Sequence, residues 1–205
     1  MNINIYDVSK KAGVSIATVS RVLNGNTRVS EKTRDKVINA MKELDFTPNV
    51  FARGLGLNTM KTIGIMCIDS SDIYLANAVY YLEQELRKYN YDSILCCTGK
   101  DYNNKKNYLE LLLSKRVDGI ILAGSQFVEN TSKHNNDYII NAAKDVPIVL
   151  VNGYLDADNI YSVMCNDEIA IYNATNLLIN NGHRNIVYLY TSKSYSGMNK
   201  YACLL

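Results

Sequence analysis

The sequence predicts an all-α head at the N-terminus followed by an α/β domain with a mainly parallel sheet. Residues 5–44 hold three short segments with apolar residues at helical spacing. From residue 62 onward, short apolar runs alternate with longer helical segments, which is typical of β-α units joined by right-handed crossovers. The 205 residues suffice for one large or two small domains, and a content of 47% hydrophobic residues can form a buried core.

The first two helices of the head are separated by a very short turn. Residues 6–12 form the first predicted helix, and Gly13 ends it because glycine adopts the left-handed conformation without a Cβ clash. Ser15 is a favourable N-cap for the second helix, residues 16–24, which Gly25 ends. Two helices joined by so short a turn cross steeply, as they do in a helix-turn-helix motif.

The third helix of the head is predicted at residues 31–44. Ser30 precedes it and is suited to cap its N-terminus. Val37, Met41 and Leu44 then lie on one face at helical spacing, where they can pack against the first two helices. The head is therefore expected to be a three-helix unit with a small apolar core.

The second helix has more small and polar positions than a buried helix needs. Val19, Val22 and Leu23 can pack on the other helices, but the remaining side chains cannot all be buried with them. A mixture of small groups, hydroxyls and one arginine suits the DNA major groove, where arginine bonds guanine and small apolar groups contact the thymine methyl. A generic three-helix bundle with a polar face is the alternative interpretation. The outward positions are Ile16, Ala17, Thr18, Ser20, Arg21 and Asn24.

The head is basic and the remainder of the chain is slightly acidic. Residues 1–60 contain nine Lys/Arg and five Asp/Glu, whereas the remaining residues contain 13 basic and 15 acidic side chains. A basic head on a slightly acidic body is the expected footprint of contact with DNA phosphates. Ordinary solvated surface charge is the alternative explanation for any single lysine.

Three segments of the head, YDVSKKAGVSIATVSRVLNG, VSEKTRDKV and TPNVFARGL, closely resemble the N-terminus of LacI/GalR (lactose-repressor/galactose-repressor) family transcription regulators. The resemblance is dense up to residue 56 and looser beyond it. It implies a sequence-specific, DNA-binding repressor that acts on a palindromic operator and that, in its complete form, is a homodimer controlled by a small, sugar-like metabolite. By position, it implies base contacts from Ile16, Ala17 and Arg21, and contacts to the DNA backbone from Ser15, Thr18, Ser20, Asn24, Arg28, Ser30 and Thr33.

A hinge is predicted at residues 48–60. Pro48 marks its start, and the following segment has room for only two helical turns, which are marginal in isolation. Gly54 and Gly56 each weaken such a helix by roughly 1 kcal/mol, so that an ordinary flexible linker is the alternative. The resemblance implies a hinge helix that folds on DNA, with Leu55 wedged into the minor groove. Gly56 departs from the commoner family residues, which suggests a softer hinge.

The body is predicted to be an open parallel sheet with helices in the connections. The run TIGIMCI at residues 62–68 is nearly continuously apolar, as expected for a strand buried on both faces. Apolar residues recur at intervals of three and four in the segments that follow each strand. The strands are expected at residues 62–68, 91–98, 117–124 and 146–152, and the helices at residues 74–89, 105–115 and 136–144.

Polar segments follow each predicted strand. Ligands of open α/β sheets bind outside the carboxyl ends of the strands, and these segments are mostly uncharged, as a sugar-like ligand would require. Strand-to-helix loops are polar in any case, which is the alternative reading. The segments are residues 69–72, 99–101, 124–126 and 152–153.

The resemblance continues through the body, which looks like the first subdomain of a periplasmic-binding-protein-like effector domain. It implies that Asp69, Ser71 and Tyr74 face a small-molecule effector. Residues 167–181 resemble the helix that enters the second subdomain, and residues 182–189 resemble the first strand of that subdomain.

Near the C-terminus, the resemblance implies a second subdomain that is incomplete in this sequence. Lys200 occupies the position of an effector-contacting arginine, and lysine lacks the bidentate fork of arginine. Family members continue past Leu205, so a fragment or an interrupted gene is expected, with open apolar edges. The predicted division is residues 1–47 for the head, 48–60 for the hinge, 61–160 for the first subdomain and 161–205 for the start of the second.

Other functional classes find little support in the sequence. It contains no G-x-G-x-x-G, no P-loop and no G-x-S-x-G, so no enzyme, catalytic residue or cofactor is expected. Two histidines and five cysteines without a C-x-x-C pair do not form a recognisable metal site. No signal peptide or membrane-spanning run is evident, and a reduced, cytoplasmic protein is expected. A small-molecule-binding module or a non-functional fragment without effective DNA binding is the alternative function.

Overall fold

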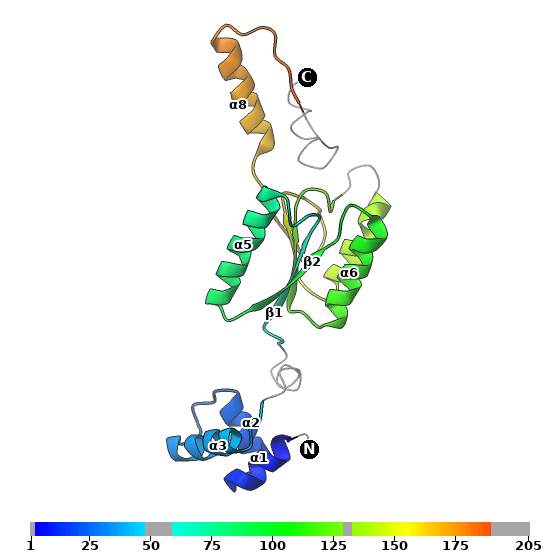
Figure 1. The fold of residues 1–205 in the computed structure, drawn as a ribbon. Coiled ribbons are helices and arrows are strands. Elements are labelled where there is room, and N and C mark those ends of the chain that lie inside the picture. The colour runs from blue at the N-terminus through cyan, green and yellow to red at the C-terminus, as the bar shows by residue number, and fades with distance from the viewer. Residues whose placement is uncertain (1–2, 48–58, 129–132, 190–205) are drawn as a thin grey trace. The chain divides into compact units, whose positions relative to one another are not determined.

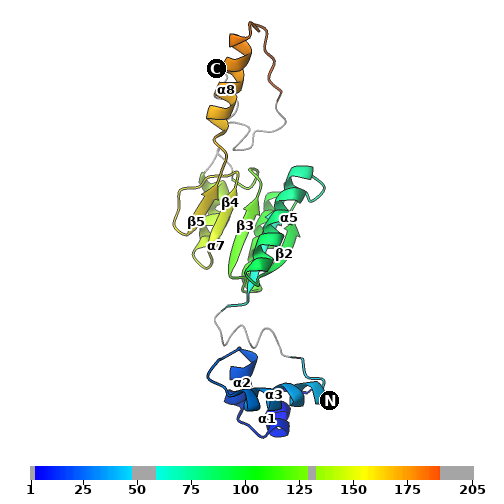
Figure 2. The ribbon, with the colours of Figure 1, turned by 90° about the vertical axis from the view of Figure 1, so that its left-hand side faces the viewer.

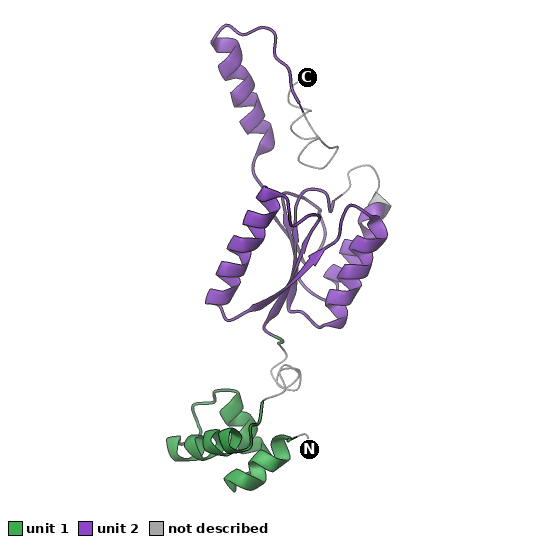
Figure 3. Ribbon diagram, viewed as in Figure 1, with its two compact units in different colours: residues 1–60 green, residues 61–205 purple. Residues whose placement is uncertain are grey.

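The computed structural model describes residues 3–47, 59–128 and 133–189. The chain divides into two compact units, which are called the head (Met1–Met60) and the body (Lys61–Leu205) below (Figure 3). The head is all-α and the body is built on a parallel sheet, which confirms the predicted fold class. The finer limits within the hinge and the body stay predictions.

The head contains α1 (Ile5–Ala12), α2 (Ile16–Leu23) and α3 (Glu31–Glu43). α1 begins one residue earlier than predicted, because Asn4 forms a reciprocal capping box with Asp7. The Asn4 side chain accepts the Tyr6 N–H at 2.8 Å, and the Asp7 carboxylate accepts the Asn4 N–H at 2.9 Å.

The limits of α2 follow the sequence closely. Gly13 ends α1 in the left-handed conformation, at a φ of 65°, and Ser15 begins α2 by accepting the N–H of Thr18. Asn24 takes the C-cap position, so α2 is one residue shorter than predicted, and Gly25 follows at a φ of 68°.

A small core holds α1, α2 and α3 together. Val8 from α1, Val19 from α2 and Val37 from α3 are completely buried, and Val22 and Ala40 are nearly so. All three helices therefore contribute to one apolar cluster, as the predicted helical faces require. Partly buried side chains surround it: Ile5, Ala12, Val14, Leu23, Val29, Met41, Leu44 and Phe46.

The body contains a five-stranded sheet in which all neighbouring strands run parallel, in the order β2-β1-β3-β4-β5 (Figure 2). Four strands lie where the sequence predicts them and are somewhat shorter. The fifth was not predicted. The strands are β1 (Thr62–Cys67), β2 (Asp92–Cys97), β3 (Gly119–Ala123), β4 (Ile148–Val151) and β5 (Ile160–Val163).

The last residues of the five strands lie in one row across the sheet. Cys67 is the register partner of Cys97 on one side and of Ala123 on the other, and the register continues from Ala123 through Val151 to Val163. The loops that leave these ends therefore emerge along one edge of the sheet, as parallel topology requires.

Helices cover both faces of the sheet. α5 (Ile73–Lys88) lies on one face, and α6 (Tyr102–Ser114) and α7 (Asp137–Ala143) lie on the other (Figures 1 and 2). A short 3-10 turn, Lys133–Asn136, leads into α7. α6 begins three residues earlier than predicted, because the Asp101 carboxylate accepts the Asn104 N–H at 2.9 Å and caps the helix.

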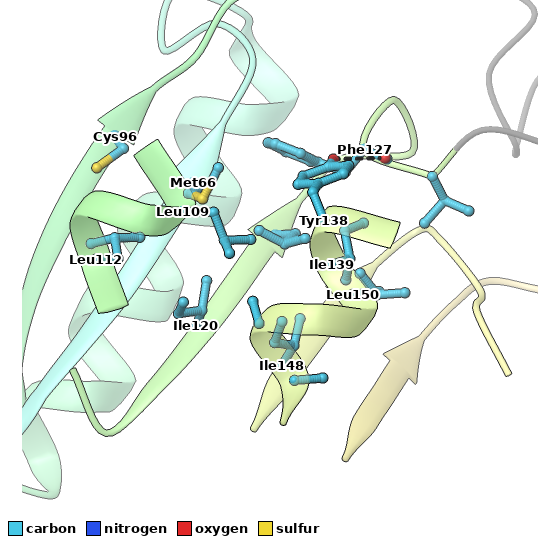
Figure 4. Packing of buried hydrophobic residues seen from close by; sticks show 14 of the residues in the cluster. Met66, Cys96, Leu109, Leu112, Ile120, Phe127, Tyr138, Ile139, Ile148 and Leu150 are labelled. Carbon is cyan, nitrogen blue, oxygen red and sulfur yellow. Dashed lines mark hydrogen bonds between the residues drawn. The ribbon is translucent and has the colours of Figure 1, made fainter. Parts of the chain in front are cut away.

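The main core of the body lies between the sheet and the α6–α7 layer (Figure 4). Leu112 of α6 and Ile120 of β3 are almost completely buried in it. At the end of this layer, the Tyr138 hydroxyl donates a hydrogen bond to the Phe127 carbonyl at 3.0 Å, drawn as a dashed line in Figure 4. This bond satisfies a buried polar group, as a tyrosine in a core requires.

The predicted helix at residues 167–181 is present as α8 (Asp167–Asn180), but the predicted strand at residues 182–189 is absent. Within the described residues, the sheet runs from β2 to β5, and none of its strands pairs with residues 182–189. This segment therefore lacks the backbone hydrogen bonds to a neighbouring strand that a strand requires. Val187 is 83% exposed. Arg184 instead donates from its guanidinium to the Ile179 carbonyl at 2.7 Å, and this carbonyl, near the end of α8, also accepts the Gly182 N–H at 3.0 Å.

In the described segments, no helix combines the length and the apolar content that crossing a membrane would require.

The packing of α6 predicts a sharp contrast between two adjacent leucines. Leu112 has no exposed surface, whereas Leu111 is 43% exposed on the same helix. Leu112→Ala should lower the free energy of unfolding by about 2–5 kcal/mol because it leaves a cavity in the core. Leu111→Ala, which removes the same atoms from a solvated position, should have a much smaller effect. Urea unfolding followed by circular dichroism measures both, and equal losses would contradict the assignment of this core.

Candidate functional site

The outward face of α2 is the first candidate site. Ile16, Ala17, Arg21 and Asn24 are exposed, and Thr18 and Ser20 are partly exposed. Val19 and Val22 point into the head core on the opposite side. The structure therefore brings the predicted base-contacting side chains of this helix onto one accessible face. Their contact with DNA remains a prediction.

The N-termini of α2 and α3 are built in the same way. The Ser15 and Thr18 hydroxyls are hydrogen-bonded to each other at 2.9 Å, and the Ser30 and Thr33 hydroxyls repeat this arrangement at 2.9 Å. Each serine also accepts the backbone N–H three residues later. Because helix N-termini carry a partial positive charge and exposed N–H groups, both ends suit DNA phosphates.

The loop between α2 and α3 is fixed by Asn26. Its N–H donates to the Arg21 carbonyl at 2.9 Å, and its side chain accepts the Arg28 N–H at 2.9 Å. The Arg34 guanidinium of α3 then donates to the Asn26 carbonyl at 2.7 Å. Arg28 is consequently held in an ordered, exposed turn beside the end of α2. The sequence predicted a role for Arg28 but not for Asn26 or Arg34. These two residues form hydrogen bonds to the loop backbone, which no sequence pattern indicates.

The loop after β1 is the second candidate site, and it is structured by its own hydrogen bonds. The Ser71 hydroxyl and the Ser71 N–H both donate to Asp69 Oδ1, at 2.7 Å and 2.8 Å. Asp72 caps α5 by accepting the Leu75 N–H at 3.0 Å. The two bonds from Ser71 lower the pKa of the Asp69 carboxyl, chiefly the bond from the hydroxyl and then the bond from the N–H. The positive charge of Lys100 lowers this pKa further.

One predicted strand-end segment, residues 152–153, contacts the start of α5 through a side-chain hydrogen bond. The Asn152 amide, at the end of β4, donates a hydrogen bond to the Tyr74 hydroxyl in the first turn of α5. Tyr74 is exposed apart from this contact, and Asn152 has a left-handed backbone with a φ of 60°. The structure thus brings Asp69, Ser71, Tyr74 and Asn152 to one edge of the sheet. Polar, mostly neutral groups of this kind can form directional hydrogen bonds to hydroxyls.

Lys105 is a buried residue of this edge that sequence reasoning missed. Its ammonium donates to the Gln126 carbonyl at 2.7 Å and lies 5.9 Å from the centroid of the Phe127 ring. Buried lysines are rare unless they are paired. Its position four residues before Leu109 places it on the apolar face of α6, which is a signal that the sequence contained.

Two predicted site residues, Leu55 and Lys200, lie outside the described residues. Among the residues that the structure does describe, no group of three or more His, Cys, Asp or Glu side chains is arranged to hold a metal ion.

Comparison with known proteins matches both units. Residues 4–49 match the family of bacterial regulatory proteins named lacI, and residues 60–202 match the periplasmic binding proteins and sugar binding domain of the LacI family. An HTH-type transcriptional regulator of Lachnoclostridium phytofermentans is 64% identical over 197 residues, which cover 96% of this chain and 59% of that protein. Catabolite control protein A of Priestia megaterium is 35% identical over 190 residues, which cover 92% of this chain and 55% of that protein.

Solved structures give the same result. The lac repressor dimer bound to operator and the anti-inducer ONPF superposes with a TM-score of 0.82 at 25% identity, covering 99% of this chain and 60% of that chain. A periplasmic binding protein/LacI transcriptional regulator from Alkaliphilus metalliredigens, complexed with D-xylulofuranose, superposes with a TM-score of 0.58 at 26% identity, covering 70% of this chain and 50% of that chain. The chain spans just over half the length of the curated relatives named above.

The hydrogen bonds of the β1–α5 loop predict a measurable titration. The lowered pKa of Asp69 means that the carboxylate form holds the loop, and that the stabilisation is lost as the pH falls through this pKa. Ser71→Ala removes the hydroxyl donor and should raise the pKa of Asp69 toward its ordinary value. Ser70→Ala, on the neighbouring exposed serine, should leave it unchanged. Side-chain carboxyl NMR against pH measures the pKa, and an unmoved Asp69 titration in Ser71→Ala would refute this account of the loop.

Proposed function

Because the chain belongs to the LacI family of bacterial regulatory proteins, we propose that it acts as a sequence-specific DNA-binding transcription regulator. In this proposal it is a repressor that responds to a small metabolite of the sugar class and acts in the cytoplasm, where the operator DNA lies. The observation that carries the proposal is the accessible face of α2, where Ile16, Ala17 and Arg21 project away from a fixed apolar core.

Base reading is assigned to three side chains of α2. Arg21 can donate two hydrogen bonds to O6 and N7 of guanine in the major groove. Ile16 and Ala17, at the N-terminal end of the same helix, provide apolar surface for thymine methyl groups. The N-terminal residues of a recognition helix contact base edges in helix-turn-helix proteins, which agrees with the positions of Ile16 and Ala17, whereas Arg21 lies in the last turn of α2.

Backbone contacts are assigned to the polar groups around this face. The two helix N-termini, with the hydroxyl pairs Ser15–Thr18 and Ser30–Thr33, offer hydrogen-bond donors to phosphates. Arg28 lies in the ordered loop between them and supplies a charge. Ser20 and Asn24 border the base-reading side chains on α2. Contacts of this kind fix the register of the head on the duplex and make binding depend on salt.

A single head makes few contacts, so two copies are needed for a tight complex. We propose a homodimer on a palindromic operator, in which Leu55 from each hinge inserts into the minor groove between base pairs. The lac repressor, which this chain resembles in fold, was solved as a dimer bound to operator.

The effector is assigned to the strand-end edge of the body. Asp69, Ser71 and Tyr74 lie there together, and Lys200 joins them in this proposal. Support comes from the match to a sugar binding domain and from the polar, mostly uncharged character of the loops. Hydroxyl-rich ligands are held by such groups, because each hydroxyl can both donate and accept a hydrogen bond.

Arg21→Ala tests the proposal most simply. The operator would first be selected from a library of palindromic DNA. The variant should then lose about 1–3 kcal/mol of discrimination between operator and scrambled DNA at fixed salt, because one bidentate base contact is removed. Its thermal unfolding should be unchanged, since Arg21 is exposed.

Lys42→Ala is the matched control for this experiment. It removes the same charge from the last turn of α3. Any effect on affinity should be equal for operator and scrambled DNA. An unchanged operator preference in Arg21→Ala would remove the base-reading assignment. If the wild-type protein selected no DNA yet bound sugars, a small-molecule-binding module would be the better description.

A further inference from the structure

The ends of β1 and β2 place two thiols side by side. Cys67 is the last residue of β1 and Cys97 is the last residue of β2, and the two are register partners. Their sulfur atoms lie 3.7 Å apart. Because register partners on parallel strands direct their side chains to the same face of the sheet, the two thiols face each other.

The two thiols differ in environment. Cys67 has no exposed surface, whereas Cys97 is exposed on the edge strand. The pKa of the Cys67 thiol is raised to about 12, first by burial and then by its hydrogen bond to Cys97. Cys96, the next residue, is the register partner of Met66 and lies in the core on the opposite face of the sheet. Cys97 is therefore the sulfur that a reagent in solvent can reach.

We propose that Cys67 and Cys97 are an oxidisable thiol pair that closes to an intrachain disulfide when the protein meets a peroxide. The geometry is close to that of the product. Neighbouring strands lie about 4.8 Å apart, which is within the range of Cα separations found across disulfides. The sulfurs need to approach by less than about 2 Å to reach a bond length of about 2.05 Å.

The reaction balances with hydrogen peroxide as the oxidant. The Cys97 thiolate attacks one peroxide oxygen, the O–O bond breaks, and the departing hydroxide takes a proton to form water. This leaves a sulfenic acid on Cys97. The Cys67 sulfur then attacks the Cys97 sulfur, the S–O bond breaks, and the Cys67 proton leaves with the hydroxyl as a second water. Two thiols are oxidised to one disulfide, and the two peroxide oxygens are reduced.

The disulfide would join two strand ends at the base of the loops described above. The Thr98 N–H donates to the Cys67 carbonyl at 2.9 Å, and the Gly99 N–H donates to the Ile68 carbonyl at 3.0 Å. Asp69 follows Cys67 by two residues. A covalent bond at this point ties the edge strand β2 to β1 where the β1–α5 loop begins. In a reducing compartment the bond would form transiently, as redox-sensing disulfides do.

Peptide mapping of the full chain tests the proposal. The reduced protein is treated with stoichiometric hydrogen peroxide, alkylated and digested with trypsin. The cross-link should join the tryptic peptide 62–87, which holds Cys67, to the peptide 89–100, which holds Cys96 and Cys97. Free thiols should fall from five to three, and dithiothreitol should restore them. Fragmentation between residues 96 and 97 assigns the sulfur in the wild-type protein.

Matched serine variants give the second readout. Cys97→Ser should abolish the cross-link, whereas Cys96→Ser and Cys165→Ser should retain it. Because Cys97 is exposed, its variant should keep the wild-type circular dichroism spectrum. The proposal is overturned if peroxide leaves no 62–87 to 89–100 peptide, if the bond assigns to Cys96, or if the disulfide joins two chains on a non-reducing gel.

Discussion

The packing of a few valines determines which side of α2 faces solvent. Val19 and Val22 are one helical turn apart and are buried against Val8 and Val37 of the other two helices. Once these side chains are inside, the helical period leaves no freedom for the remaining positions of α2, and Arg21 must point outward. The caps of the helix fix its ends, but the valines fix its rotation. The chemistry of the outward face therefore depends on apolar residues that never contact a ligand.

In the body, the parallel pairing of the strands determines where the candidate functional loops lie, as the valines determine the orientation of α2. The five strand ends are register partners in one row, so the loops that follow them are gathered at a single edge without any direct attraction between the loops. Both the Tyr74–Asn152 contact and the Cys67–Cys97 pair result from this alignment. Side chains that are far apart in the sequence can thereby contact the same ligand.

The sequence was most informative where single residues interrupt a regular pattern. Gly13 and Ser15 define the turn before α2 to within one residue, because the left-handed conformation and the N-cap each favour few residue types. The outward face of α2 followed from the same spacing. The resemblance to LacI-family regulators, on which the individual site residues depend, is confirmed at the level of the family.

Other features were missed because they depend on contacts between distant parts of the chain. β5 has only four residues, which is too short for a periodic pattern to distinguish it from a loop, and its pairing with β4 identifies it. The prediction of a strand at residues 182–189 was wrong, because the apolar residues of this segment have no neighbouring strand to pair with in the described structure. The hydrogen bond from Asn152 to Tyr74 joins residues 78 positions apart, which no local pattern encodes.

Amide NMR of the protein titrated with its selected palindromic operator shows whether the outward face of α2 contacts DNA. If it does, the largest shifts should fall on residues 15–24 and on the loop that contains Arg28, while amides of the Lys11–Glu43 side of the head move little. If the shifts spread evenly over the head, or concentrate on α3 while Ile16, Ala17 and Arg21 stay unmoved, the outward face of α2 is not the surface that binds DNA.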